Sequence, residues 1–157
     1  MKRQNNIMPI LDSSDNMLVS NCNCCVYSSC IFVINSIVAF YYEYYLYSFL
    51  FVTLLITSLI YHTNYNTYTY LLDQLSVFSI VFYGGYIFFQ KFYRINTYYQ
   101  TVCAFGVIAA FLLTLYLYLY GFIYTAFCFC ECKKTSDNYH SLLHIISSIG
   151  HYIIVIM

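Results

Sequence analysis

Long apolar segments, separated by short polar connectors, dominate the sequence. A helix needs ~20 mostly apolar residues to cross the ~30 Å hydrocarbon core of a bilayer. Segments of at least about this length occupy residues 24–42, 44–62, 68–89, 97–130 and 139–157. The pattern predicts an all-α protein, a polytopic transmembrane helical bundle over residues 23–157 that follows a polar tail at residues 1–22.

Residues 97–130 leave the number of spans open. As one helix these 34 residues would be ~51 Å long, which exceeds the thickness of the hydrocarbon core. They fit either one tilted helix or two short spans joined by a tight turn. The apolar pattern alone therefore predicts five or six spans.

Composition supports a membrane protein. The chain is 62% hydrophobic and only 8% charged, whereas soluble domains carry about 25% charged residues. We therefore expect an integral, multi-pass membrane protein, and the sequence does not say which membrane holds it. Its partner is expected to be membrane lipid. The formal net charge is zero, and without a basic face we expect no nucleic-acid partner.

Few ionisable groups lie inside the apolar segments, and such groups indicate function by default. His140 and His144 are four residues apart, so both lie on one face of a helix. Ser58 and His62 have the same spacing, and the short connector after His62 puts Asp73 at a similar depth. Three imidazoles, a carboxylate and a hydroxyl are thus expected to converge near one membrane face.

Three histidine nitrogens with one open position form a catalytic zinc arrangement, and a nearby aspartate can hold or deprotonate the bound water. Each residue also has a simpler interpretation. The histidines could be solvated at the interface, Asp73 could favour a helix N-terminus, and Ser58 could bond its own backbone.

The same residues resemble the signature of a known family. Ser58-Leu59-Ile60-Tyr61-His62, Asp73 and His140-Ser141-Leu142-Leu143-His144 are similar to the Ser-x3-His, Asp and His-x3-His motifs of the CREST superfamily. That superfamily includes alkaline ceramidases, progestin and adiponectin receptors, and GPI-processing phospholipases. Residues 135–139, which lead into the last motif, look most like the phospholipase branch.

The resemblance implies zinc held by His62, His140 and His144. Asp73 and Ser58 would be the catalytic groups that position the attacking water and stabilise developing charge. The implied activity is hydrolysis of a lipid amide or ester bond. The family usually has seven spans, three of them between the aspartate helix and the last helix. This chain has room for one or two there, so it would be a shortened member.

A shared metal also limits the topology. His62 and His140 must lie at one membrane face, so an odd number of crossings must fill residues 97–130. This favours one long helix, five spans, and an N-terminus on the side of the site. Lys133 and Lys134 would lie on that side, with Lys91 and Arg94 on the other, so basic residues do not settle the orientation.

Two other functional classes stay open. His62 and His144 could be the axial ligands of a haem, or the chain could be a structural or receptor-like membrane protein without chemistry. His151 lies ~16 Å deeper than His140 and is expected to be satisfied by a neighbouring helix. The eight cysteines are expected to be mainly small apolar fillers. Depending on the side of the membrane, they are also candidates for acylation or disulfide formation.

Overall fold

The computed structural model describes residues 24–157, and every regular element in this range is helical. By length and composition, five helical units can cross a membrane. The predicted all-α bundle is therefore confirmed, while the predicted tail at residues 1–22 lies outside the described range. The elements are α1 (Cys24–Ser29), α2 (Ile31–Tyr41), α3 (Tyr45–Thr63), α4 (Thr67–Phe92), α5 (Tyr98–Leu115), the π-helical η1 (Tyr116–Tyr120), α6 (Gly121–Tyr124), the 3-10 turn η2 (Phe127–Phe129) and α7 (Lys133–Ile156).

Polar connectors end the spans because their side chains satisfy the free amides of the next helix. Asn66 Oδ1 accepts a hydrogen bond from the Thr69 amide at 2.9 Å, and Thr69 Oγ1 accepts one from the Asn66 amide at 3.2 Å. This capping box starts α4. Thr97 caps α5 in a similar way, by accepting a hydrogen bond from the Gln100 amide at 3.2 Å.

The segment that was ambiguous in the sequence is one continuous helix. α5 passes through η1 into α6, and the helix ends where Thr125 takes a positive φ of 50°. A single long span is therefore confirmed over two short ones. The first predicted span is also present as one unit, Cys24–Tyr41, although a turn at Cys30 divides it into α1 and α2. α7 begins at Lys133 rather than at residue 139, because its polar first turns extend beyond the apolar pattern.

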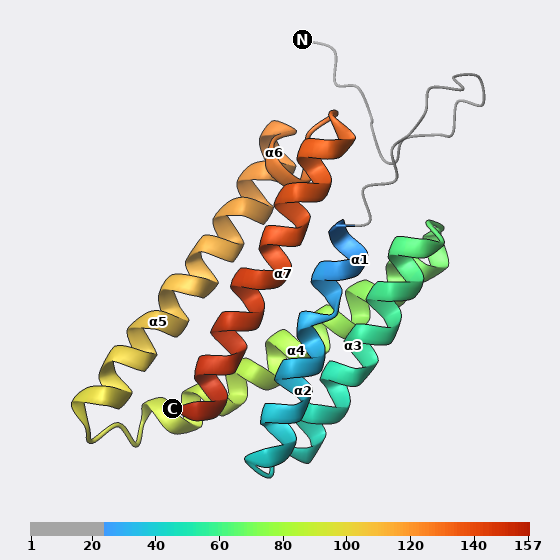
Figure 1. Ribbon diagram of the computed structural model, residues 1–157. Helices are drawn as coiled ribbons and strands as arrows, with labels where there is room; N and C mark the ends of the chain where they lie inside the picture. The colour runs from blue at the N-terminus through green and yellow to red at the C-terminus, as the bar shows by residue number, and fades with distance from the viewer. Residues whose placement is uncertain (1–23) are drawn as a thin grey trace, which may run out of the picture.

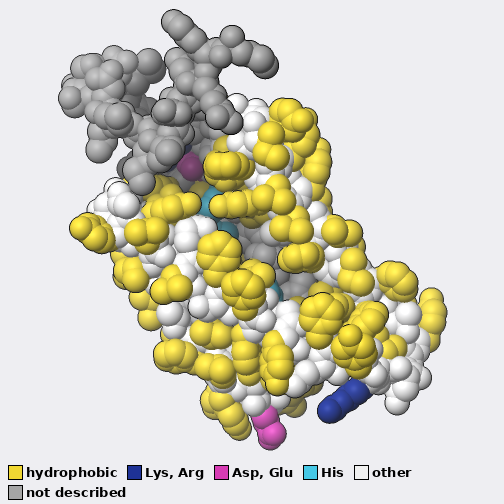
Figure 2. Space-filling model, turned by 180° about the vertical axis from the view of Figure 1, so that it is seen from behind, with side chains coloured by type: hydrophobic (Ala, Val, Ile, Leu, Met, Phe, Trp, Pro, Cys, Tyr) yellow, Lys and Arg dark blue, Asp and Glu magenta, His cyan; other side chains and the backbone are white. Residues whose placement is uncertain are grey.

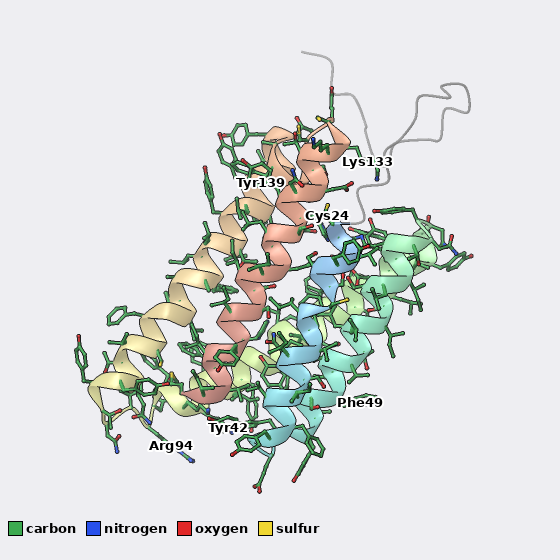
Figure 3. The ribbon with its side chains drawn as sticks, in the orientation of Figure 1. Cys24, Tyr42, Phe49, Arg94, Lys133 and Tyr139 are labelled. Carbon is green, nitrogen blue, oxygen red and sulfur yellow. The ribbon has the colours of Figure 1, made fainter. Side chains whose placement is uncertain are left out.

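The first span lies between two other spans. α1 and α2 pack against both α3 and α7, while α4 packs on α3 and α5 on α7 (Figure 1). Cys24 and Lys133 lie at one end of the bundle, and Tyr42 and Arg94 lie at the other (Figure 3). The first described residues are therefore at the end where α7 begins, as the parity of the crossings predicted.

The surface of the bundle is apolar and its interior contains paired polar groups. Large apolar side chains cover most of the face seen in Figure 2. Inside, Asn35 Nδ2 donates to the Ser148 carbonyl at 3.2 Å, and Ser148 Oγ donates to Asn35 Oδ1 at 3.1 Å. These bonds join α2 to α7. Such pairing between helices, with apolar side chains outside, is typical of a membrane bundle.

At the end of the bundle opposite Lys133, Lys91 links α4 to α7. Lys91 Nζ donates to the carbonyls of Ile154 and Val155 at 2.8 and 2.6 Å. These carbonyls belong to the last turn of α7, where a cation offsets the negative end of the helix dipole. The contact ties α4 to α7 and fixes the end of the helix that carries two of the predicted site residues.

Candidate metal centre

Three histidines from two distant spans meet at one end of the bundle. One ring nitrogen from each of His62, His140 and His144 lies within 4.8 Å of the others. The ring centroids are 5.0 Å apart for His62 and His140, 5.5 Å for His62 and His144, and 4.7 Å for His140 and His144. The structure thus brings together all three of the imidazoles that the sequence singled out as metal ligands.

Helix geometry explains the convergence. His62 lies in the last turn of α3, and His140 and His144 lie one turn apart near the start of α7. α1 packs against both helices and holds their ends near each other. Three nitrogens bound at about 2.0–2.1 Å to a tetrahedral ion would be roughly 3.4 Å from one another. The observed limit of 4.8 Å is slightly wider, so small side-chain shifts would close the site.

His62 carries a buried ring nitrogen that needs a partner. The residue is buried, and its Nε2 atom has no hydrogen-bond partner among the described residues. Buried polar atoms are nearly always satisfied, so an unpaired one needs an explanation. An ion held between the three rings would supply the missing partner.

The other nitrogen of His62 faces a tyrosine in the connector between α3 and α4. The Tyr65 hydroxyl lies 3.5 Å from His62 Nδ1. Partial burial raises the pKa of Tyr65 to about 12, and the Asp137 carboxylate shifts it in the same direction. The phenol therefore stays neutral at physiological pH. Its oxygen can accept a hydrogen bond from Nδ1–H, which leaves Nε2 unprotonated.

Ser58 and Asp73 are buried, but neither forms a hydrogen bond with an imidazole within the described range. Asp73 accepts a hydrogen bond from Thr57 Oγ1 at 3.4 Å and pairs with no cation among the described residues. Ser58 is fully buried, and its hydroxyl lies 2.9 Å from that of Ser29. Ser29 Oγ also lies 2.8 Å from the Cys25 carbonyl, and when Ser29 donates its hydrogen there, Ser58 is the donor to Ser29.

Sequence reasoning missed several polar residues around the cluster. Thr57 contacts Asp73, Tyr65 contacts His62, and Ser28 contacts His144. One signal was present: Cys25, Ser28 and Ser29 are three and four residues apart, so they form a polar face within an apolar span. Thr57 and Tyr65 adjoin predicted residues and had no signal of their own.

The cluster leaves little space for a haem between His62 and His144. The His140 ring lies about 5 Å or less from both of the other rings. A macrocycle between the two proposed axial ligands would have to displace it. None of the cysteines among residues 24–157 belongs to the three-histidine cluster. The arrangement thus suits one small ion.

His151 belongs to a separate polar contact deeper in the bundle. Its Nδ1 atom forms a hydrogen bond with the hydroxyl of Tyr47, a fully buried residue of α3. Its ring also packs edge-on against Phe51 at 5.6 Å between centroids. This agrees with the expectation that a neighbouring helix satisfies His151.

Gly84 allows α4 to approach this contact, which gives a stability prediction. A Cβ atom at Gly84 would lie 2.8 Å from His151 Nδ1 and would also overlap the Tyr47 hydroxyl. Gly84→Ala is therefore expected to lower the unfolding free energy by about 1–3 kcal/mol. Gly85→Ala is the matched control, because its Cβ would meet no atom within 4 Å. Unfolding of the two variants in detergent micelles measures the difference, and equal stabilities would contradict the packing.

A comparison of the chain with protein-family models, curated proteins and solved structures finds no match.

Proposed function

We propose that this chain is a zinc-dependent integral-membrane hydrolase of a lipid amide or ester bond, with zinc held by His62, His140 and His144. The observation that carries the proposal is the convergence of three imidazoles, one of which has a buried nitrogen without a hydrogen-bond partner among residues 24–157. The resemblance of the motifs to the CREST superfamily supports the same ligand set and reaction.

The setting of the cluster supports a lipid substrate. Histidine side chains are visible inside a hollow in the apolar surface of the bundle (Figure 2). His140 is only partly buried. A molecule that reaches these side chains through an apolar surface must itself be largely apolar. Its reacting group must be polar enough to interact with a metal and water.

Zinc with three protein ligands keeps a position for water and lowers the pKa of that water to about 7. Asp73 is the buried carboxylate that would take up the proton of the attacking water. The water oxygen forms a bond to the substrate carbonyl carbon, and the carbon–nitrogen or carbon–oxygen bond breaks. The proton then passes to the departing amine or alcohol, so the products are a fatty acid and an amine or alcohol.

The hydrogen bonds of Ser58 narrow its role. When its hydrogen is donated to Ser29, the Ser58 oxygen can only accept a hydrogen bond. Ser58 is therefore suited to hold a hydrogen of the attacking water. It is not suited to donate to an oxyanion. Positioning the nucleophile is the more consistent of the two roles that the motif implies.

Removal of the metal tests the function. In bilayer-reconstituted protein, a zinc chelator is expected to abolish release of fatty acid from ceramide or phospholipid, and added Zn²⁺ is expected to restore it. Mg²⁺ is the control, because it prefers oxygen ligands and octahedral geometry. A panel of one ceramide and one diacyl phospholipid distinguishes amide from ester hydrolysis. Hydrolysis that survives full removal of zinc would refute the proposal.

A further inference from the structure

α1 connects the two helices that carry the histidines. It has only six residues, yet its polar side chains reach both α7 and α3. Cys25 Sγ donates to the Asp137 carbonyl of α7 at 3.3 Å, and Ser29 contacts Ser58 of α3. Ser28 Oγ lies 2.9 Å from Nδ1 of His144. A polar side chain of the first span thus contacts one of the three imidazoles directly.

The hydroxyl hydrogen of Ser28 has an acceptor within its own helix. Ser28 Oγ donates to the Cys25 carbonyl, three residues earlier in the helix, at 3.0 Å. A hydroxyl has one hydrogen and two lone pairs. With its hydrogen on Cys25, Ser28 can only accept from His144, so Nδ1 of His144 carries the ring hydrogen. In a neutral imidazole with Nδ1–H, the lone pair is on Nε2.

We infer that Ser28 is a positioning residue that fixes His144 in the Nδ1–H tautomer and directs its Nε2 lone pair into the three-histidine cluster. Metal-bound histidines commonly donate their second N–H to an oxygen, which orients the ring and makes it a better ligand. Here that oxygen would come from the first span, outside the three motifs. This inference rests on the proposed zinc site and adds α1 to the two helices that supply its ligands.

Zinc affinity tests the inference without reference to catalysis. Ser28→Ala removes the acceptor, and loss of such a partner typically weakens metal binding 10- to 100-fold. We expect a rise of that size in the zinc Kd, measured by competition with a chromophoric chelator. Ser28→Thr keeps the hydroxyl and is expected to restore most of the affinity. Ser147→Ala is the matched control, because Ser147 bonds the backbone carbonyl of His144 and not its ring.

A second measurement reads the tautomer itself in zinc-free protein. In ¹⁵N-histidine NMR spectra, His144 of the wild type is expected to show the Nδ1–H form, and Ser28→Ala is expected to reduce its population. If the wild type binds zinc and Ser28→Ala has the same zinc Kd and the same His144 tautomer, the inference about Ser28 is wrong and the proposed zinc site stands. Wild-type protein without zinc at the cluster would refute the proposed function, so the two failures can be distinguished.

Discussion

Asp73→Asn is expected to lower the rate of lipid hydrolysis by roughly 10²- to 10⁴-fold, the usual contribution of a positioned general base. Asparagine has nearly the same shape, and its amide oxygen can still accept the hydrogen bond from Thr57. It cannot take up a proton. Bound zinc should stay at the wild-type level, because Asp73 is not among the three ligands. Initial rates of fatty acid release and the zinc content of the same samples give both values.

Asp137→Asn is the matched control for this substitution. Asp137 is also a buried aspartate near the histidines, but its carboxylate pairs with Lys133 at 3.7 Å. We expect its replacement to change the hydrolysis rate less than tenfold, because the ion pair already occupies the carboxylate. An unchanged rate in Asp73→Asn would remove Asp73 from the mechanism. A larger loss of rate in Asp137→Asn than in Asp73→Asn would show that Asp137, and not Asp73, is the general base.

The convergence of the three histidines could be predicted because the bilayer limits the alternatives. An imidazole inside an apolar span needs a polar partner, and the chain has only four histidines. The spacing of His140 and His144 put both rings on one face of α7. The requirement that they share a face of the membrane with His62 then fixed the parity of the spans. The single helix through residues 98–124 follows from that parity.

The sequence shows a polar face in the first span, but it does not show which hydroxyl reaches the histidines, because hydroxyls in helices usually bond their own backbone. Thr53 and Ser79 do so, each with the carbonyl four residues earlier, at partly exposed positions. Ser28 makes a similar backbone bond and also contacts His144. The sequence looks the same in both cases. Only the packing of α1 between α3 and α7 decides which hydroxyl reaches the site.

The turn at Cys30 was not predicted from the sequence. Residues 24–42 contain no proline or glycine, but the hydroxyls of Ser28 and Ser29 both bond the Cys25 carbonyl just before the turn, and such bonds often bend helices. The break separates α1 from α2, which both pack on α3 and α7. The apolar pattern predicts the length of this span but not the turn that separates α1 from α2.

His140→Ala is expected to remove zinc from the protein and to abolish lipid hydrolysis together with it. Two imidazoles would remain, and a catalytic zinc site needs three protein ligands. The remaining fold should persist, because His140 forms no hydrogen bond among the described residues that ties α7 to another helix. His151→Gln is the matched control, since His151 is the one histidine outside the cluster. That variant should keep its zinc.

Metal analysis of detergent-purified protein tests the central claim most directly. The three-histidine site predicts about one zinc per chain in the wild type and in His151→Gln, and none in His140→Ala. A wild-type protein without zinc after purification in zinc-containing buffer, or equal zinc in His140→Ala, would contradict the claim.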